Sequence, residues 1–144
     1  MVQQDTIRLM RECGSGIKMG ISAIDEVYDS VCSDGFKNIL CKSRNTHAKL
    51  GEELRLLLNE YGEEDREPSP IVKGMSWLRT NAALAVNESD RAIADLLTDG
   101  CGMGIKNLSR YLNKYSAADQ RSRDITKKLC DCEQELLVDM RSFL

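Results

Sequence analysis

The stretch Cys13-Gly14-Ser15-Gly16-Ile17-Lys18 returns in the second half of the chain as Cys101-Gly102-Met103-Gly104-Ile105-Lys106, with a change only at Ser15, which becomes Met103. Both copies lie in long segments whose apolar residues recur every three or four positions, which is the pattern of an amphipathic helix. The repeat predicts an internal duplication of a helical hairpin, with small residues at one level of each first helix. The fold class that follows is all-α.

The first hairpin begins with a helix that starts at Asp5 or Thr6, either of which is a good N-cap, and stops at residues 33–35. Its second helix is predicted from Phe36 to Tyr61, and Gly62 ends it. Because the break between these helices is short, we expect them to be antiparallel neighbours. The predicted inward stripe of the second helix is Phe36, Leu40, Ser43, His47, Leu50, Leu54, Leu57 and Tyr61.

An acidic segment at 63–70, which contains both prolines of the chain, predicts an exposed linker. Ser69 and Pro70 are a favourable N-cap and first helical residue for a short amphipathic helix that reaches about Val86. This crossover is long enough to travel the length of a bundle. We therefore expect the next long helix to run parallel to the second one.

The third long helix is predicted to begin within residues 87–90, where two caps overlap and Asn87 with Asp90 forms the better capping box, and to reach Tyr115. The fourth is predicted to open at Ser116 and to reach Phe143, with an inward stripe that includes Cys132. The second, third and fourth helices are each about 26 residues long, and matched lengths favour a bundle. We predict one four-helix-bundle domain over residues 1–144.

Composition narrows the classes of function. The chain of 144 residues has a net charge of −3, with charges of both signs and no basic stripe, which argues against nucleic-acid binding. No apolar run approaches the roughly 20 residues of a membrane span, and the N-terminus lacks the pattern of a signal peptide. We therefore expect a cytoplasmic protein without membrane association, whose six cysteines are reduced thiols that pack as small hydrophobes.

Two hairpins joined by a long crossover have the connectivity of the ferritin-like superfamily. The segments Val72-Lys73-Gly74, Asn87–Asp90 and Gly100–Gly104, up to Tyr111 and Tyr115, resemble small bacterial ferritin-like domains of uncharacterised function. The resemblance implies a ferritin-like four-helix bundle. Members of the superfamily that bind two metals carry a carboxylate on each of two helices and a Glu-x-x-His pair on each of the other two.

The chain departs from that ligand pattern. Three positions before His47 stands Arg44 instead of glutamate, and the first helix offers only apolar residues at that level. The third helix offers Cys101 and Gly104 there, and the fourth has acids but no histidine. We therefore expect that the di-iron ligands are lost and that the protein is not an enzyme.

A different metal site is an alternative. His47, Cys101, Cys130 and Glu133 are all predicted near the middle of the bundle, and one imidazole with thiolates and a carboxylate suits zinc or another thiophilic metal. The simpler interpretation is that His47 is a core histidine hydrogen-bonded to Ser43 and that the cysteines fill space. The metal set is therefore part of an alternative hypothesis only.

The glycines within the helices need a compensating gain, since each costs up to about 1 kcal/mol relative to alanine. One interpretation is close backbone approach between the first and third helices at one layer. The other is space for a ligand or a local distortion of the helix. A cavity lined by Gly14, Gly104 and apolar neighbours would favour the ligand.

The leading functional hypothesis is a non-catalytic helical bundle that acts through protein contacts, either by forming a homo-oligomer such as a dimer or by binding a protein partner. Trp77, Leu84 and Val86 of the crossover are the candidate apolar face. The alternatives are a metal-binding or redox protein that uses the His/Cys site, and a protein that binds a small apolar ligand between the glycine-bearing helices.

Overall fold

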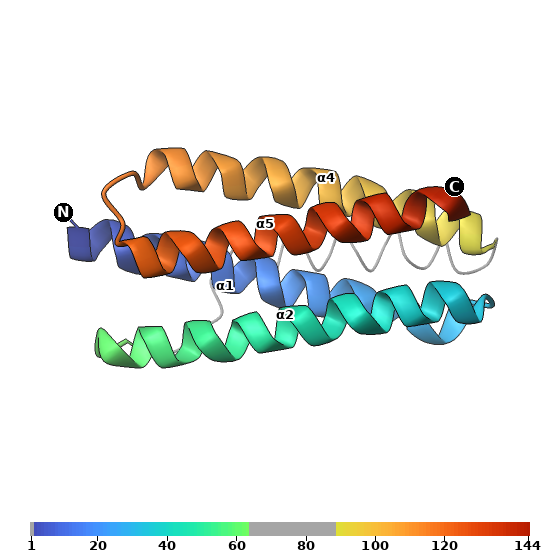
Figure 1. The fold of residues 1–144 in the computed structure, drawn as a ribbon, viewed down its shortest axis with the longest axis horizontal. Coiled ribbons are helices and arrows are strands. Elements are labelled where there is room, and N and C mark those ends of the chain that lie inside the picture. Colours follow the sequence, from blue (N-terminus) through green and yellow to red (C-terminus); the bar gives the residue numbers. More distant parts are fainter. Residues whose placement is uncertain (1, 64–88) are drawn as a thin grey trace.

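The computed structural model describes residues 2–63 and 89–144, and every regular element in these two ranges is helical (Figure 1). The predicted all-α class is confirmed, whereas the predicted short helix before Val86 lies outside the described residues. Within the described ranges, the long helices are α1 (Val2–Val27), α2 (Asp34–Glu60), α4 (Asp90–Lys114) and α5 (Gln120–Met140), with 3-10 turns at Tyr28–Ser30 and Arg141–Phe143.

The four helices lie lengthwise beside one another (Figure 1). The first hairpin is formed by α1 and α2 and the second by α4 and α5, and α2 runs in the same direction as α4. The helices within each hairpin pack closely, as α2 does on α5, whereas α1 packs less closely on α4. The face between α1 and α4 is therefore the less filled side of the bundle.

Each described turn ends or starts a helix with a specific cap. The side chain of Ser33 accepts a hydrogen bond from the backbone N–H of Phe36 at 3.3 Å and so caps α2. Asp119 caps α5 in the same way through Ser122 N–H at 2.8 Å, and Ser89 caps α4. Gly62, with φ of 73°, follows α2 in the left-handed conformation that glycine adopts most easily.

The predicted starts or caps of all four long helices differ from the structure. The second helix begins at Asp34 after the Ser33 cap and not at Phe36, and the third is capped by Ser89 and not by Asn87.

The first helix begins at Val2, so Asp5 and Thr6 lie inside it and do not cap it. The fourth helix is capped by Asp119 and not by Ser116. At these two helix starts, the side chains of Asp5, Thr6 and Asp119 form hydrogen bonds with residues far away in the sequence.

Side-chain hydrogen bonds link the two hairpins to each other at both ends of the bundle. At one end, the carboxylate of Asp90 accepts the backbone N–H groups of Cys32 and Ser33, both at 2.8 Å. At the other end, Thr6 Oγ1 accepts the N–H of Asp119 at 2.8 Å, and Asp5 accepts that of Ala117 at 3.2 Å. The start of each hairpin thus completes the turn of the other one.

The core is divided into two large apolar clusters. The first lies toward the α1–α2 turn, where Phe36 stacks on Phe143 with ring centroids 4.7 Å apart. The buried members of this first cluster are Ile24, Val27, Val31, Phe36, Leu40, Ile93, Ala94, Leu97, Cys101, Leu136 and Met140. The second cluster, in the other half of the bundle, comprises Met10, Cys13, Ile17, Leu50, Leu54, Leu57, Leu58, Leu108, Ile125 and Leu129. Between these clusters along α2 and α5 lie four buried side chains with polar or sulfur atoms, namely Ser43, His47, Cys132 and Glu133.

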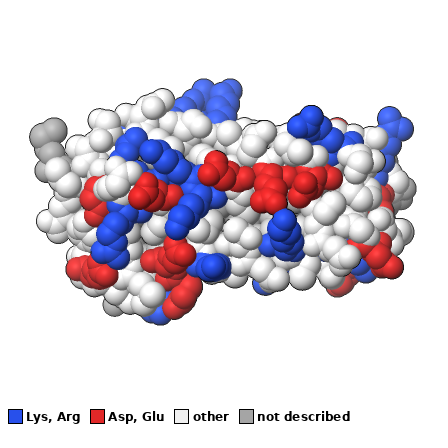
Figure 2. Space-filling view, viewed as in Figure 1, with Lys and Arg blue, Asp and Glu red and all other residues white. Residues whose placement is uncertain are grey.

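Charged side chains of both signs are interspersed over the face shown in Figure 2. Exposed ion pairs join the helices, such as Arg44 with Asp25 at 2.6 Å and Arg121 with Glu60 at 2.6 Å. Exposed pairs of this kind contribute little to stability. Among the described helices, none has the length and apolar character needed to cross a bilayer.

Candidate functional site

His47 is buried at the middle of the bundle, with 1% of its surface exposed. Its Nδ1 lies 2.8 Å from the carbonyl oxygen of Ser43, one helical turn earlier on α2. Because a carbonyl only accepts hydrogen bonds, Nδ1 carries a hydrogen and donates it. The predicted hydrogen bond between His47 and Ser43 is confirmed.

The other ring nitrogen, Nε2, is buried and has no hydrogen-bond partner in the described part of the chain. The carboxylate of Glu133 lies close to it, with Oε1 3.7 Å away, beyond hydrogen-bond length. An unpaired buried polar atom costs about 1–3 kcal/mol. Some gain has to offset this cost, and a bound group that pairs with Nε2 is one such gain.

Two glycines make room for this polar pair. A Cβ atom at Gly20 on α1 would overlap the imidazole ring of His47, with Nε2 as the nearest atom. A Cβ at Gly104 on α4 would overlap the carboxylate of Glu133. The glycines on α1 and α4 thus allow the ring from α2 and the carboxylate from α5 to reach the space between the helices.

The electrostatics of the pair favour a charged imidazole. Burial opposes that charge, but the Cys132 thiol, the nearby Glu133 carboxylate and the Ser43 carbonyl outweigh it and raise the pKa of His47 to about 10. At neutral pH Nε2 is then a hydrogen-bond donor that faces a carboxylate.

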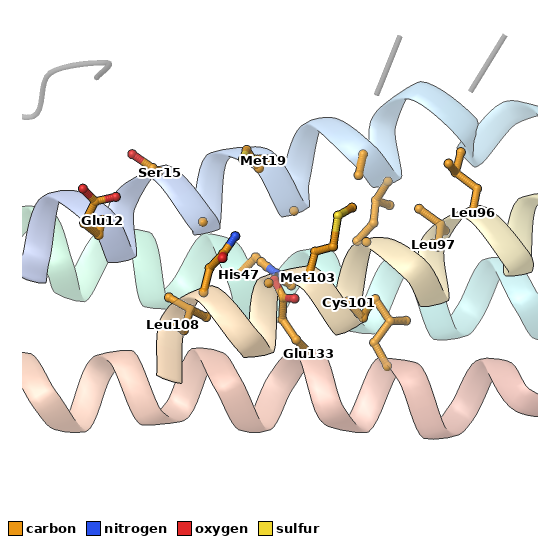
Figure 3. Close-up of a pocket in the computed structure, with 18 of the residues that line it drawn as sticks. Glu12, Ser15, Met19, His47, Leu96, Leu97, Cys101, Met103, Leu108 and Glu133 are labelled. Carbon is orange, nitrogen blue, oxygen red and sulfur yellow. Dashed lines mark ion pairs between the residues drawn. The ribbon is translucent and has the colours of Figure 1, made fainter. Parts of the chain in front are cut away.

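Beside this pair lies a cavity of about 370 Å³ between α1 and α4. Figure 3 shows Glu12 and Ser15 at one end, Leu96 and Leu97 at the other, and His47 and Glu133 between them. A volume of this size is within the range of small-molecule sites. The described residues that line it are Glu12, Ser15, Gly16, Met19, Gly20, Ala23, Ile24, His47, Leu96, Leu97, Gly100, Cys101, Met103, Gly104, Asn107, Leu108, Tyr111, Glu133 and Leu136.

The predicted close backbone approach of the glycine-bearing helices is wrong. The atoms nearest to their glycines are side-chain atoms, and a Cβ at Gly100 or Gly102 would meet no described atom within 4 Å. Of the two glycines predicted to line a cavity, Gly104 does so. Gly14 does not, because it faces Leu54 Cδ2 of α2, which lies 3.2 Å from a Cβ built there. Four glycines of α1 and α4 line the cavity, namely Gly16, Gly20, Gly100 and Gly104.

The structure brings together two of the four predicted metal ligands. His47 and Glu133 face each other and Cys101 lines the same cavity, whereas Cys130 is only half-buried and is not part of the lining. Cys132, which the metal hypothesis left out, has its Sγ 3.5 Å from His47 Nδ1. The apolar stripe of the fourth helix already placed Cys132 inward. Within residues 2–63 and 89–144, no three His, Cys, Asp or Glu side chains are grouped to hold a metal, and metal binding stays a prediction.

The thiols near the site are poor nucleophiles. Burial raises the pKa of Cys101 well above its ordinary value and that of Cys13 to about 12, so both are protonated at neutral pH. Cys132, His47 and Glu133 are the residue types of a cysteine-hydrolase triad, but Cys132 does not line the cavity. Moreover, the ring nitrogen beside it already donates to Ser43. The arrangement lacks an accessible nucleophile next to a free base.

No known family model, curated protein or solved structure matches this chain. Inferences about function therefore start from three features of its own residues. These are the glycine-lined cavity, the unpaired Nε2 of His47 at its wall, and the carboxylate of Glu133 beside that nitrogen.

Proposed function

We propose that this protein is a non-catalytic helical bundle that binds a small, mostly apolar molecule in the cavity between α1 and α4. The observation that carries the proposal is the unpaired, buried Nε2 of His47, a residue that lines a cavity of about 370 Å³. An engineered apolar cavity of about 150 Å³ is sufficient to bind benzene. The larger space here accommodates about fifteen non-hydrogen atoms on that scale.

The glycines support this proposal because they produce the cavity at a cost to helix stability. Gly16, Gly20, Gly100 and Gly104 are unfavourable in helix interiors by up to about 1 kcal/mol each relative to alanine. A Cβ at Gly100 would meet no described atom within 4 Å, so local packing does not require the glycine there. A requirement for open space in the cavity explains why glycine stands at position 100.

We also propose that the layout is ferritin-like, with the metal ligands lost. The shared direction of α2 and α4 supports it, as does the position of the end of α2 and the start of α4 at opposite ends of the bundle (Figure 1). At mid-height, the level where the resemblance implies carboxylates on the first and third helices, α1 and α4 carry Gly20 and Gly104. A ligand cavity then occupies the place of a di-metal centre.

Two variants on one helix test the cavity. Gly100→Leu puts a side chain into the lining, whereas Gly102→Leu adds the same side chain at an exposed position outside it. The probe is 1-aminoanthracene, a neutral dye small enough for this volume that fluoresces in apolar sites. We expect the original protein and Gly102→Leu to bind it and Gly100→Leu to lose binding at least about tenfold. Equal binding by the two variants, or none by the original protein, would contradict the proposal.

The predicted roles in self-association and metal binding are tested separately. Trp77, Leu84 and Val86 lie outside the described residues, so a dimer stays a prediction, and a monomeric mass by light scattering at micromolar concentration would refute it. For the metal, zinc titration followed by elemental analysis is compared with His47→Ala. Stoichiometric zinc that is lost in this variant would favour the metal site over the ligand cavity.

A further inference from the structure

The wall of the cavity presents one donor and one acceptor side by side. His47 Nδ1 is already used by the Ser43 carbonyl at 2.8 Å, which leaves only Nε2 for a ligand. Glu133 Oε1 lies 3.7 Å from Nε2, and no other hydrogen-bond partner of Glu133 is found in the described residues. An oxygen atom at hydrogen-bond length from both groups would pair with both, and because Nε2 is buried the ring has to turn slightly toward the cavity to admit it.

The chemistry of that pair selects the ligand's polar group. A hydroxyl oxygen accepts from Nε2–H while its own hydrogen is donated to the carboxylate, so one group satisfies both atoms. A carboxylate ligand would face the negative charge of Glu133, and an ammonium ligand would face a protonated imidazole. The raised pKa of His47 supports this, since the two charges of the pair then cancel.

The cavity is asymmetric about the pair. Toward one end it is lined by aliphatic side chains, including Leu96 and Leu97, and toward the other end by Glu12 and Ser15 together with Leu108 (Figure 3). From Gly104 back to Leu97, α4 spans about 10 Å, which is enough for a chain of about eight carbon atoms. The apolar part of a ligand therefore fits the end lined by Leu96 and Leu97.

We infer that the ligand is an uncharged amphiphile whose hydroxyl group bridges His47 Nε2 and Glu133 and whose aliphatic chain extends toward Leu96 and Leu97. This inference rests on the proposed function and assigns the chemical class of the molecule. His47 and Glu133 act as binding residues, while Gly20 and Gly104 provide the space that the ring and the carboxylate occupy.

Four probes with the same chain test the head group by isothermal titration calorimetry. They are 1-octanol, 1-methoxyoctane, octanoate and octylammonium. We expect 1-octanol to bind best and each of the other three to bind at least about tenfold more weakly. The ether lacks the donor for Glu133, and the ions place a charge beside one of like sign.

Glu133→Gln is the variant that isolates charge, because it keeps the size of the side chain and removes its negative charge. In it we expect the disadvantage of octanoate relative to 1-octanol to fall at least about fivefold, because the repelling charge is removed. Gly102→Leu, outside the cavity, should leave the order of the four probes unchanged. Thermal unfolding of each variant confirms that it is folded.

The outcomes separate the two proposals. Tight binding of octanoate, octylammonium or the ether, equal to that of 1-octanol, would overturn the hydroxyl assignment while leaving a ligand cavity in place. An unchanged preference against octanoate in Glu133→Gln would also overturn it. Binding of none of the four probes, together with no dye binding, would overturn the proposed function itself.

Discussion

The ends and the middle of this bundle differ in how completely their groups are paired. At the ends, Asp90 and Thr6 accept backbone N–H groups of the opposite hairpin's turn, and the adjoining side chains form closely packed apolar clusters. In the middle, Nε2 of His47 has no partner in the described structure and a cavity lies beside it. The difference indicates that the ends supply stability and that the middle is available for binding.

The largest effect is expected from a core residue at one end. Phe36 is fully buried and stacks on Phe143, so Phe36→Ala should lower the free energy of unfolding by about 3–5 kcal/mol. Urea denaturation measures this loss. The control is Leu56→Ala, at a side chain 53% exposed, which should change stability by less than about 0.5 kcal/mol. A loss below about 1 kcal/mol at Phe36 would contradict the assignment of stability to the ends.

The next largest effect is a pH-dependent change in the free energy of unfolding, which comes from His47 in the middle of the bundle. The pKa of His47 is raised to about 10 in the folded protein, against about 6.5 when unfolded, so its stabilising contribution is complete below about pH 6.5 and is lost as the pH rises to about 10. The groups facing the ring are Glu133 and Cys132 of α5 and Gly20 of α1. Over this pH window we expect the protein to lose about 2–4 kcal/mol more than the variant His47→Gln does.

Denaturation at a series of pH values, with protein and variant measured together, cancels the titration of all other groups. Parallel pH profiles for the two proteins would show that His47 is neutral in the folded state. The charge assignment of the pair would then be wrong.

A smaller loss is expected at the fastened ends. Asp90→Ala removes the acceptor of two backbone N–H groups, those of Cys32 and Ser33, and should cost about 1–3 kcal/mol. Asp99, an exposed residue of the same helix, provides the matched control as Asp99→Ala and should be nearly neutral. Equal effects of the two substitutions on the urea midpoint would mean that the contact between the hairpins contributes nothing.

The smallest expected changes in stability come from alanine substitutions at two glycines in the middle of the bundle, and they have opposite signs. Gly100→Ala should raise stability by about 0.5–1 kcal/mol, because a Cβ there meets no described atom within 4 Å and alanine favours the helix. Gly20→Ala should lower stability, because its Cβ would overlap the imidazole of His47. Thermal melting of both variants measures the contrast. A gain at Gly20 would show that the ring is free to move away.

Most of the fold was predictable from local patterns. The three-and-four spacing of apolar residues placed the inward faces of the helices, and Gly62 marked the end of α2 correctly. The start of α1 was missed because Asp5 and Thr6, which look like caps, accept hydrogen bonds from the α4–α5 turn instead. Contacts between residues so distant in sequence leave no local signal.

The candidate site was predictable only in part. Helical spacing put His47 and Glu133 near one level, and they do face each other. It did not show that Gly20 and Gly104 stand opposite these two side chains, since spacing fixes the face of a residue but not its neighbour on another helix. The choice of Cys130 over Cys132 was a different error, because the stripe itself favoured Cys132.

The reciprocal fastening of the hairpins has a consequence for cooperativity. The backbone N–H of Ser33 is held by the second hairpin and that of Asp119 by the first, so neither turn is complete in an isolated hairpin. Both amides should therefore exchange with solvent only when the hairpins separate, and at a common opening free energy. Hydrogen exchange at these two amides, on opposite ends of the molecule, then reports a single unfolding unit.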